Sequence, residues 1–202
     1  MTTPTTATGM HLDFDTAVWL AGPPVGTTAD EIARWVVDAT AACMDDFDVT
    51  AHTAQAGYLH EVLNSFATAE LACDFRFIRL RALNDIPLIA RLNIIVDTPL
   101  EEVLAATDPT ASAPAAGGRW YERAPQTETL DEQRGLERRT WFAVDDGGIR
   151  PHVRHHRRVE AYDVDLVLSC AAHSLRAVAA GMADLDALAR GISIVDENGA
   201  QW

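Results

Sequence analysis

The stretch at positions 136–159, LERRTWFAVDDGGIRPHVRHHRRV, decides the fold because it predicts a β-hairpin. Two runs with strand-like composition, 136–144 and 149–159, flank the segment Asp-Asp-Gly-Gly, whose residues favour tight turns between antiparallel strands. A further apolar run at 164–170 follows after a few residues. Short connections of this kind join antiparallel neighbours, since parallel strands need a long crossover. The centre of the chain is therefore predicted to be antiparallel sheet.

Working outward from this hairpin, the same patterns predict further strands and several amphipathic helices. Additional strands are expected at 11–20, 75–82, 88–96 and 192–195, where apolar residues alternate or cluster. Helical spacing of apolar residues predicts helices at 28–43, 53–71, 98–107, 174–182 and 184–188. Thr28 and Glu31 have the spacing of a capping box, and Pro99 is expected at the first helical position.

Helices thus cluster near both ends of the chain around a run of hairpin-linked strands. We expect an α+β fold in which a mainly antiparallel sheet is flanked by helices, as an α/β/α sandwich. Residues 1–9 are expected to be a disordered lead-in, and 10–202 a single domain. The segment 108–119 is predicted to be a mobile loop, because DPTASAPAAGG is rich in Ala, Pro and Gly.

Two segments resemble the PsbP-like family, of which actinobacteria carry many members. They are LIARLNIIVDTPLEEV at 88–103 and VRHHRRVEAYDVDLVLSCAAHSLRAVAAGMADLDALA at 153–189. The resemblance would extend over about 10–196 and implies an α/β/α sandwich that acts mostly by binding. The chain departs from the family in lacking a transit peptide, a lipidated cysteine and every lysine, so no particular function of a family member is carried over.

The charge of the chain excludes several function classes. The formal net charge is −14, and all 16 basic residues are arginine. Phosphate backbones and anionic membranes require clustered positive charge, so no nucleic-acid or membrane partner is expected. P-loop and Schiff-base chemistry both need a lysine. No apolar run approaches the length of a membrane span, and three scattered cysteines are typical of free thiols, so a cytoplasmic location is predicted.

The strand at 152–158 is the most unusual local feature because it carries alternating basic residues. With a period of two, one face presents His152, Arg154, His156 and Arg158, and the partner strand adds Arg139 and Trp141. This basic stripe would suit an acidic partner, a carboxylate or a phosphate. The alternative is a sheet face whose charge the chain's own acids, such as Glu137 and Glu160, neutralise.

Neither a metal site nor a catalytic motif is predicted. His152 and His156 would lie roughly 13 Å apart along a strand, too far for one zinc ion. His11, Asp13 and Asp15 are better explained as the polar face of a strand. The chain lacks Gly-x-Ser-x-Gly, Gly-x-Gly-x-x-Gly, Cys-x-x-Cys and His-Glu-x-x-His. Cys170 is expected to be a buried thiol, and no cofactor is expected.

Two functional hypotheses follow from these patterns. In the first, the chain is a binding or adaptor domain that associates with another protein, or with itself, through a sheet face bordered by Arg154, Arg158 and Trp141. In the second, it is a small-molecule-binding protein or an enzyme whose Arg and His side chains hold an anionic ligand. Trp19, Trp120 and Trp141 would be interface anchors if exposed, whereas Trp19 and Trp141 would be core residues if helices cover both faces of the sheet.

Overall fold

The computed structural model describes residues 7–83, 85–111, 118–121, 124–145, 148–172, 174–196, 199 and 201–202. Its elements, in chain order, are β1 (Ala7–Leu12), β2 (Trp19–Ala21), α1 (Ala29–Asp46), α2 (Ala54–Thr68), β3 (Phe75–Arg79), β4 (Leu88–Val96), α3 (Leu100–Ala106), the 3-10 helix η1 (Pro109–Ala111), β5 (Arg119–Trp120), β6 (Gln126–Asp131), β7 (Leu136–Asp145), β8 (Gly148–Val159), β9 (Val164–Ala171), α4 (Leu175–Arg190) and β10 (Ile192–Asp196).

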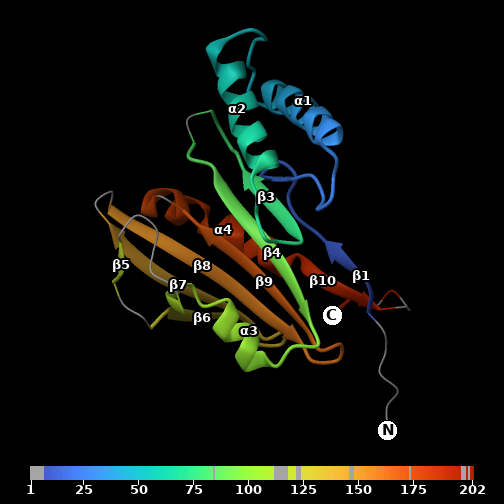
Figure 1. The fold of residues 1–202 in the computed structure, drawn as a ribbon, viewed down its shortest axis with the longest axis vertical. Coiled ribbons are helices and arrows are strands. Elements are labelled where there is room, and N and C mark those ends of the chain that lie inside the picture. The colour runs from blue at the N-terminus through green and yellow to red at the C-terminus, as the bar shows by residue number, and fades with distance from the viewer. Residues whose placement is uncertain are drawn as a thin grey trace.

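The predicted hairpin, β7 and β8, is part of an eight-stranded sheet, in which β8 pairs with the central strand β9 (Figure 1). The strands follow the order β2-β3-β4-β9-β8-β7-β5, with β6 also paired to β7, and every pairing is antiparallel. In the hairpin, Asp145 pairs with Gly148, as the turn sequence predicted. This arrangement confirms the α+β class with an antiparallel sheet and helices packed against it.

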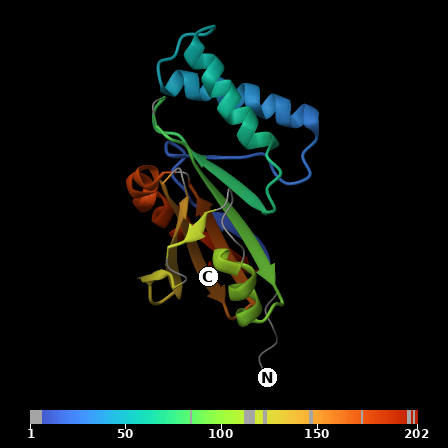
Figure 2. The same cartoon turned by 60° about the vertical axis from the view of Figure 1, so that its left-hand side comes forward.

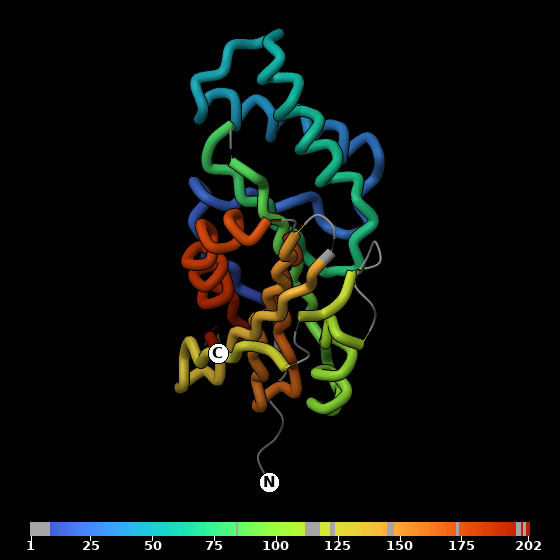
Figure 3. The backbone as a smooth tube through the Cα atoms, turned by 90° about the vertical axis from the view of Figure 1, so that its left-hand side faces the viewer, coloured from blue at the N-terminus to red at the C-terminus, as the bar shows by residue number. Residues whose placement is uncertain are grey.

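One face of the main sheet is covered by α4 and by the two-stranded sheet of β1 and β10. Leu88 and Leu92 of β4 and Leu168 of β9 are fully or almost fully buried there, together with Leu185 and Leu188 of α4. Figure 3 shows α4 on one side of the strands and α3 on the other. Burial of this apolar face is the main term that stabilises the domain.

The opposite face is covered only in part. The α1–α2 hairpin packs on it through Leu59, Leu63 and Phe66 of α2 against Ile78 and Ile89 of β3 and β4. The short helix α3 lies farther along the same sheet, at the other end of the molecule from α1 and α2 (Figures 1 and 2). Between these two covers, side chains of β4, β8 and β9 line a pocket.

Local capping interactions explain where the long helices begin. The Thr28 hydroxyl accepts from the Glu31 backbone N–H and the Glu31 carboxylate accepts from the Thr28 N–H, so the predicted capping box of α1 is confirmed. Thr53 caps α2, and Ser174 caps α4 in the same manner, by accepting from Ala177 N. None of the helices within the described ranges is long and apolar enough to cross a membrane.

Two predictions about strand and helix boundaries were wrong. The single strand expected at 11–20 is two strands in different sheets, because the Asp15 carbonyl and carboxylate accept from the next backbone N–H groups and form a turn. The helices expected at 174–182 and 184–188 are one helix. Asp184 does not cap it but accepts from the Arg79 guanidinium, and this contact holds α4 on the sheet.

Smaller corrections concern the lead-in, α3 and the loop. Residues 7–9 of the expected lead-in belong to β1, where Ala7 and Gly9 pair with β10, and 1–6 lie outside the described residues. Pro99 occupies the N-cap of α3 and not its first helical position. Of the loop expected at 108–119, Pro109–Ala111 forms η1 and 112–117 lie outside the described residues.

Candidate functional site

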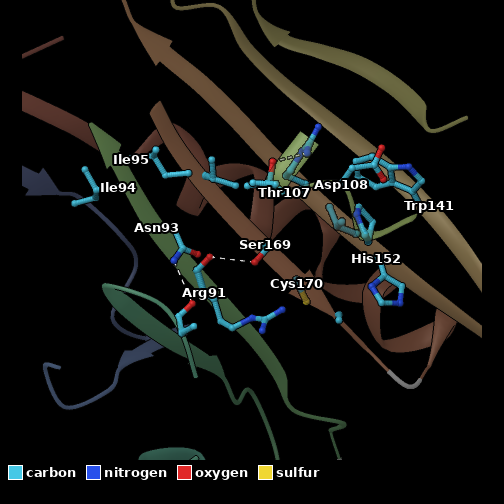
Figure 4. Close-up of a pocket in the computed structure, with 17 residues that line it drawn as sticks. Arg91, Asn93, Ile94, Ile95, Thr107, Asp108, Trp141, His152, Ser169 and Cys170 are labelled. Atoms are coloured by element: carbon cyan, nitrogen blue, oxygen red, sulfur yellow. Dashed lines mark hydrogen bonds between the residues drawn. The ribbon is translucent and has the colours of Figure 1, made fainter. Parts of the chain in front are cut away.

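The pocket on the partly covered face has a volume of about 470 Å³, within the range of small-molecule sites. Its floor is the sheet, where β4, β9, β8 and β7 run side by side, and one wall is the C-terminal end of α3 with the residues that follow it (Figure 4). Its polar lining residues are Arg91, Asn93, Thr107, Asp108, His152, Arg154 and Ser169. Trp141 closes one end, next to His152.

Strand register places three arginines in one row across this face. Arg91 on β4 pairs with Ser169 on β9, Ser169 pairs with Arg154 on β8, and Arg154 pairs with Arg139 on β7. Directly opposite residues of antiparallel strands have Cβ atoms about 5 Å apart. The sheet therefore brings positive side chains from three strands together around one serine hydroxyl.

Arg154 is a buried guanidinium that lacks a carboxylate partner. It is 3% exposed, its Nη1 donates to Thr107 Oγ1 at 2.6 Å and to Leu104 O at 3.3 Å, and it lies 5.0 Å from the centre of the Trp141 ring. No ion pair to Arg154 is formed by any part of the chain that the structure describes. Burial, together with the neighbouring charge of Arg139, lowers the pKa of Arg154 to about 10.

Arg91 projects into the same pocket without forming a salt bridge or side-chain hydrogen bond to the described residues (Figure 4). The positive charge of Arg91 acts to lower the pKa of two neighbouring side chains, His152 and Cys170. Burial lowers the pKa of His152, and Arg91 and Arg150 lower it further, so the imidazole is neutral at pH 7. Burial raises the pKa of Cys170 to about 12, against the opposing effect of Arg91, so this thiol is not a nucleophile at neutral pH.

Hydrogen-bonding capacity in and beside the pocket is unbalanced towards donors. Arg154 Nε, Trp141 Nε1 and, next to the pocket, Arg139 Nε are buried donors with no acceptor among the described residues. Acceptor oxygens of the lining, in contrast, already have donors: Thr107 Oγ1 accepts from Arg154, and Asp108 Oδ1 accepts from Thr110. Buried donors without partners are rare in folded proteins, and these three leave this part of the sheet with more donors than acceptors.

The predicted basic stripe is divided between this pocket and a separate ion-pair network. His152, Arg154 and Trp141 line the pocket, with Arg139 beside it. His156 and Arg158 lie outside the pocket.

The His156–Arg158 network is centred on a buried carboxylate. Asp165 is 0% exposed and bonds to His156 Nε2 at 2.6 Å and to Arg158 Nη1 at 2.5 Å. Arg158 also pairs with Asp163 and, at 3.6 Å, with Glu160. For this half of the stripe the contacts agree with neutralisation by the chain's own acids.

Sequence patterns missed Arg91 and Asn93, which come from a strand expected to be structural. The available signal was the alternation in β4, where Arg91 and Asn93 share the face of Ile89 and Ile95. The sequence left two alternatives for Trp19 and Trp141, core residues or interface anchors. Both side chains are 2% exposed, so both are core residues. Trp120 packs edge-on against His152, with ring centres 4.8 Å apart.

The described residues contain no cluster of three or more His, Cys, Asp or Glu side chains that could hold a metal ion. His11 lies on β1, whereas Asp13 and Asp15 lie in the connection to β2, so the three do not share one strand face.

Two comparisons with known proteins gave no relative: no protein-family model matches the chain, and no curated protein matches it. Among solved structures, the chain is similar to the Ran-binding protein Mog1p of Saccharomyces cerevisiae, with 15% identity and a TM-score of 0.37 over 65% of this chain and 85% of that one. A mutant of protein Mog1 gives 14% identity and a TM-score of 0.37 over 66% and 86%. The resemblance to the PsbP-like family stays a prediction.

Proposed function

We propose that this chain binds a small anionic ligand in the pocket between α3 and the sheet, with Arg91 and Arg154 as the charged contacts. The observation that carries the proposal is the presence of two arginines on one pocket that have no carboxylate partner among the described residues, in a chain of net charge −14. Acidic side chains are abundant, yet none among the described residues lies within ion-pairing distance of the buried Arg154. A bound anion would supply the missing charge and the missing acceptor oxygens.

The hypothesis of a protein partner is less well supported at the surface first expected for it. Arg154 and Trp141 are 3% and 2% exposed and line the pocket, so neither side chain stands at the outer surface where a macromolecule would dock. Arg158 is held by Asp163 and Asp165. A pocket of this size instead fits a small molecule, and association with a protein or with a second copy remains a prediction that needs another surface.

Calorimetric titration with a panel of small anions, including inorganic phosphate and acetate, tests the proposal at low ionic strength. Arg91→Gln should weaken binding at least tenfold, because it removes a charge that no described carboxylate neutralises. Arg34→Gln is the matched control, since Arg34 is exposed on α1, away from the pocket. The proposal is overturned if no anion binds, or if Arg91→Gln and the parent bind equally well.

A further inference from the structure

We infer, on the basis of the proposed function, that the pocket selects an organic monocarboxylate with an apolar body over a phosphate. The inference concerns the ligand class of the same site. It follows from the charge balance of the lining, from its hydrogen-bonding groups and from the apolar walls that surround them.

The charges of the described lining residues leave room for one negative charge. Arg91 and Arg154 are positive, Asp108 is negative, and His152 is neutral at pH 7 because its pKa is lowered. Two arginines against one aspartate give one net positive charge. A monocarboxylate neutralises it, whereas a phosphate dianion would leave a net negative charge in a partly buried site, which is unfavourable.

The negative charge in this count belongs to Asp108, whose side chain is held in a fixed position in the wall of the pocket. Asp108 follows α3 directly, and its Oδ1 is fixed by hydrogen bonds from the N–H and the hydroxyl of Thr110 at 2.8 Å and 2.7 Å. Its charge raises the pKa of Arg154 and so helps to keep that guanidinium protonated. A second negative charge on the ligand would be repelled by the same carboxylate.

The remaining lining is apolar and fits a hydrocarbon body. Side chains of Ile95 and Val167 from the sheet, Ala106 and Pro109 from the α3 wall, and the Trp141 ring surround the charged row. The volume of about 470 Å³ is far larger than a carboxylate group requires. A bidentate carboxylate–guanidinium contact with a chain along these residues would use both parts of the pocket.

The test is a calorimetric titration of the whole protein with acetate, butyrate, hexanoate and octanoate at pH 7.5, beside inorganic phosphate and propyl phosphate. Burial of one methylene is worth about fourfold in affinity, so each two-carbon step should tighten binding about tenfold or more until the pocket is full. Hexanol, which has the chain without the charge, should bind at least tenfold more weakly than hexanoate.

Two variants test separately the contact with the carboxylate group and the contact with the hydrocarbon chain of the ligand. Arg91→Gln should weaken all four carboxylates by a similar factor. Ile95→Thr should leave acetate unchanged and reduce the gain from acetate to octanoate by at least threefold, because Ile95 lines the pocket and is partly exposed.

The outcomes distinguish this inference from the proposed function. If phosphate or propyl phosphate binds more tightly than every carboxylate, or if affinity does not change with chain length, the monocarboxylate inference is wrong while the anion site stands. If none of these anions binds, the proposed function fails and the inference fails with it.

Discussion

Arg154 lies directly opposite Arg139 across the β7–β8 pair, so two guanidinium groups share one step of the sheet. Arg139 is paired with Glu137 at 3.0 Å, whereas Arg154 has only neutral oxygen partners among the described residues. Like charges directly opposite each other destabilise a sheet. Arg154 therefore lowers the stability of the fold and also faces a pocket. These are the features of a binding residue whose destabilising effect on the free protein is offset when a ligand binds.

We predict that Arg154→Met leaves the free energy of unfolding within about 1 kcal/mol of the parent, or raises it, because it replaces an unpaired buried charge with an apolar side chain of similar length. Anion binding should be lost. Urea denaturation at low ionic strength measures the first effect and calorimetric titration the second.

Arg79→Met is the matched contrast. Arg79 is buried to the same degree, at 4% exposed, but donates to Asp85 at 2.8 Å and Asp184 at 2.7 Å. Its loss removes the partner of Asp85 and leaves Asp184 only the longer contact with Arg81, at 3.8 Å, and should cost about 3 kcal/mol. A loss as large for Arg154→Met as for Arg79→Met would mean that Arg154 is a structural residue.

Asp165 should be among the most sensitive positions in the sheet. It is fully buried and accepts from both His156 and Arg158. Asp165→Asn keeps the shape but removes the charge that these two side chains share, so we expect a loss of about 3 kcal/mol in urea denaturation. Glu160→Gln is the control: Glu160 is 83% exposed and 3.6 Å from the same guanidinium, and its loss should change stability by less than about 0.5 kcal/mol.

His155 should make the fold less stable in mild acid. Burial lowers its pKa below the ordinary value despite the hydrogen bond to Asp186 at 2.7 Å, so the folded state resists a proton that the unfolded chain takes up near pH 6.5. The free energy of unfolding should therefore fall as pH drops from 7 to 5, by up to about 2 kcal/mol from this residue. Asp186, whose pKa is also lowered, contributes only at lower pH, near and below the ordinary range of a carboxyl.

His155→Gln, which retains an N–H donor for Asp186, should remove that part of the pH dependence in urea denaturation at pH 5, 6 and 7. The control is His60→Gln, at an exposed position on α2, which should leave the pH dependence of the free energy of unfolding as it is in the parent. A parent protein that becomes more stable from pH 7 to pH 5 would show that His155 is charged in the folded state and ion-paired with Asp186.

Local patterns predicted two features whose hydrogen bonds are local. The capping box at Thr28 and the turn that joins β7 to β8 each depend on contacts within a few residues, and both were predicted. The turn at Asp15 that divides 11–20 is itself local, but the placing of the two strands in different sheets depends on pairing with β10 and β3, which are distant in sequence. Alternation alone carries no information about such partners.

The candidate site was only half predictable for the same reason. Arg154, His152 and Trp141 were singled out because they lie close together in the hairpin. Arg91 and Ser169 join them only through the β4–β9 and β8–β9 registers, which the sequence does not specify by local rules. Whether a basic side chain meets an acid of the same chain, as Arg158 does, also depends on tertiary contacts.

Gly191 should tolerate no side chain, although its backbone conformation would accept one. Gly191 caps α4 with φ of −78°, but a Cβ there would overlap the carbonyl oxygen of Asp13. The backbone N–H of Asp13 donates to Gly191 O at 2.9 Å, which holds the two residues together. Gly191→Ala must therefore push the β1–β2 connection away from α4, and we expect a loss of about 3 kcal/mol.

Gly57→Ala is the control of opposite sign. Gly57 lies within α2, and a Cβ there would meet nothing within 4 Å, so alanine should stabilise the protein by about 1 kcal/mol through its higher helix propensity. Urea denaturation of both variants measures the two effects. If Gly191→Ala is as stable as the parent, the close approach of Asp13 to Gly191 is not maintained in solution, and the connection between β1 and β2 moves without cost to the fold.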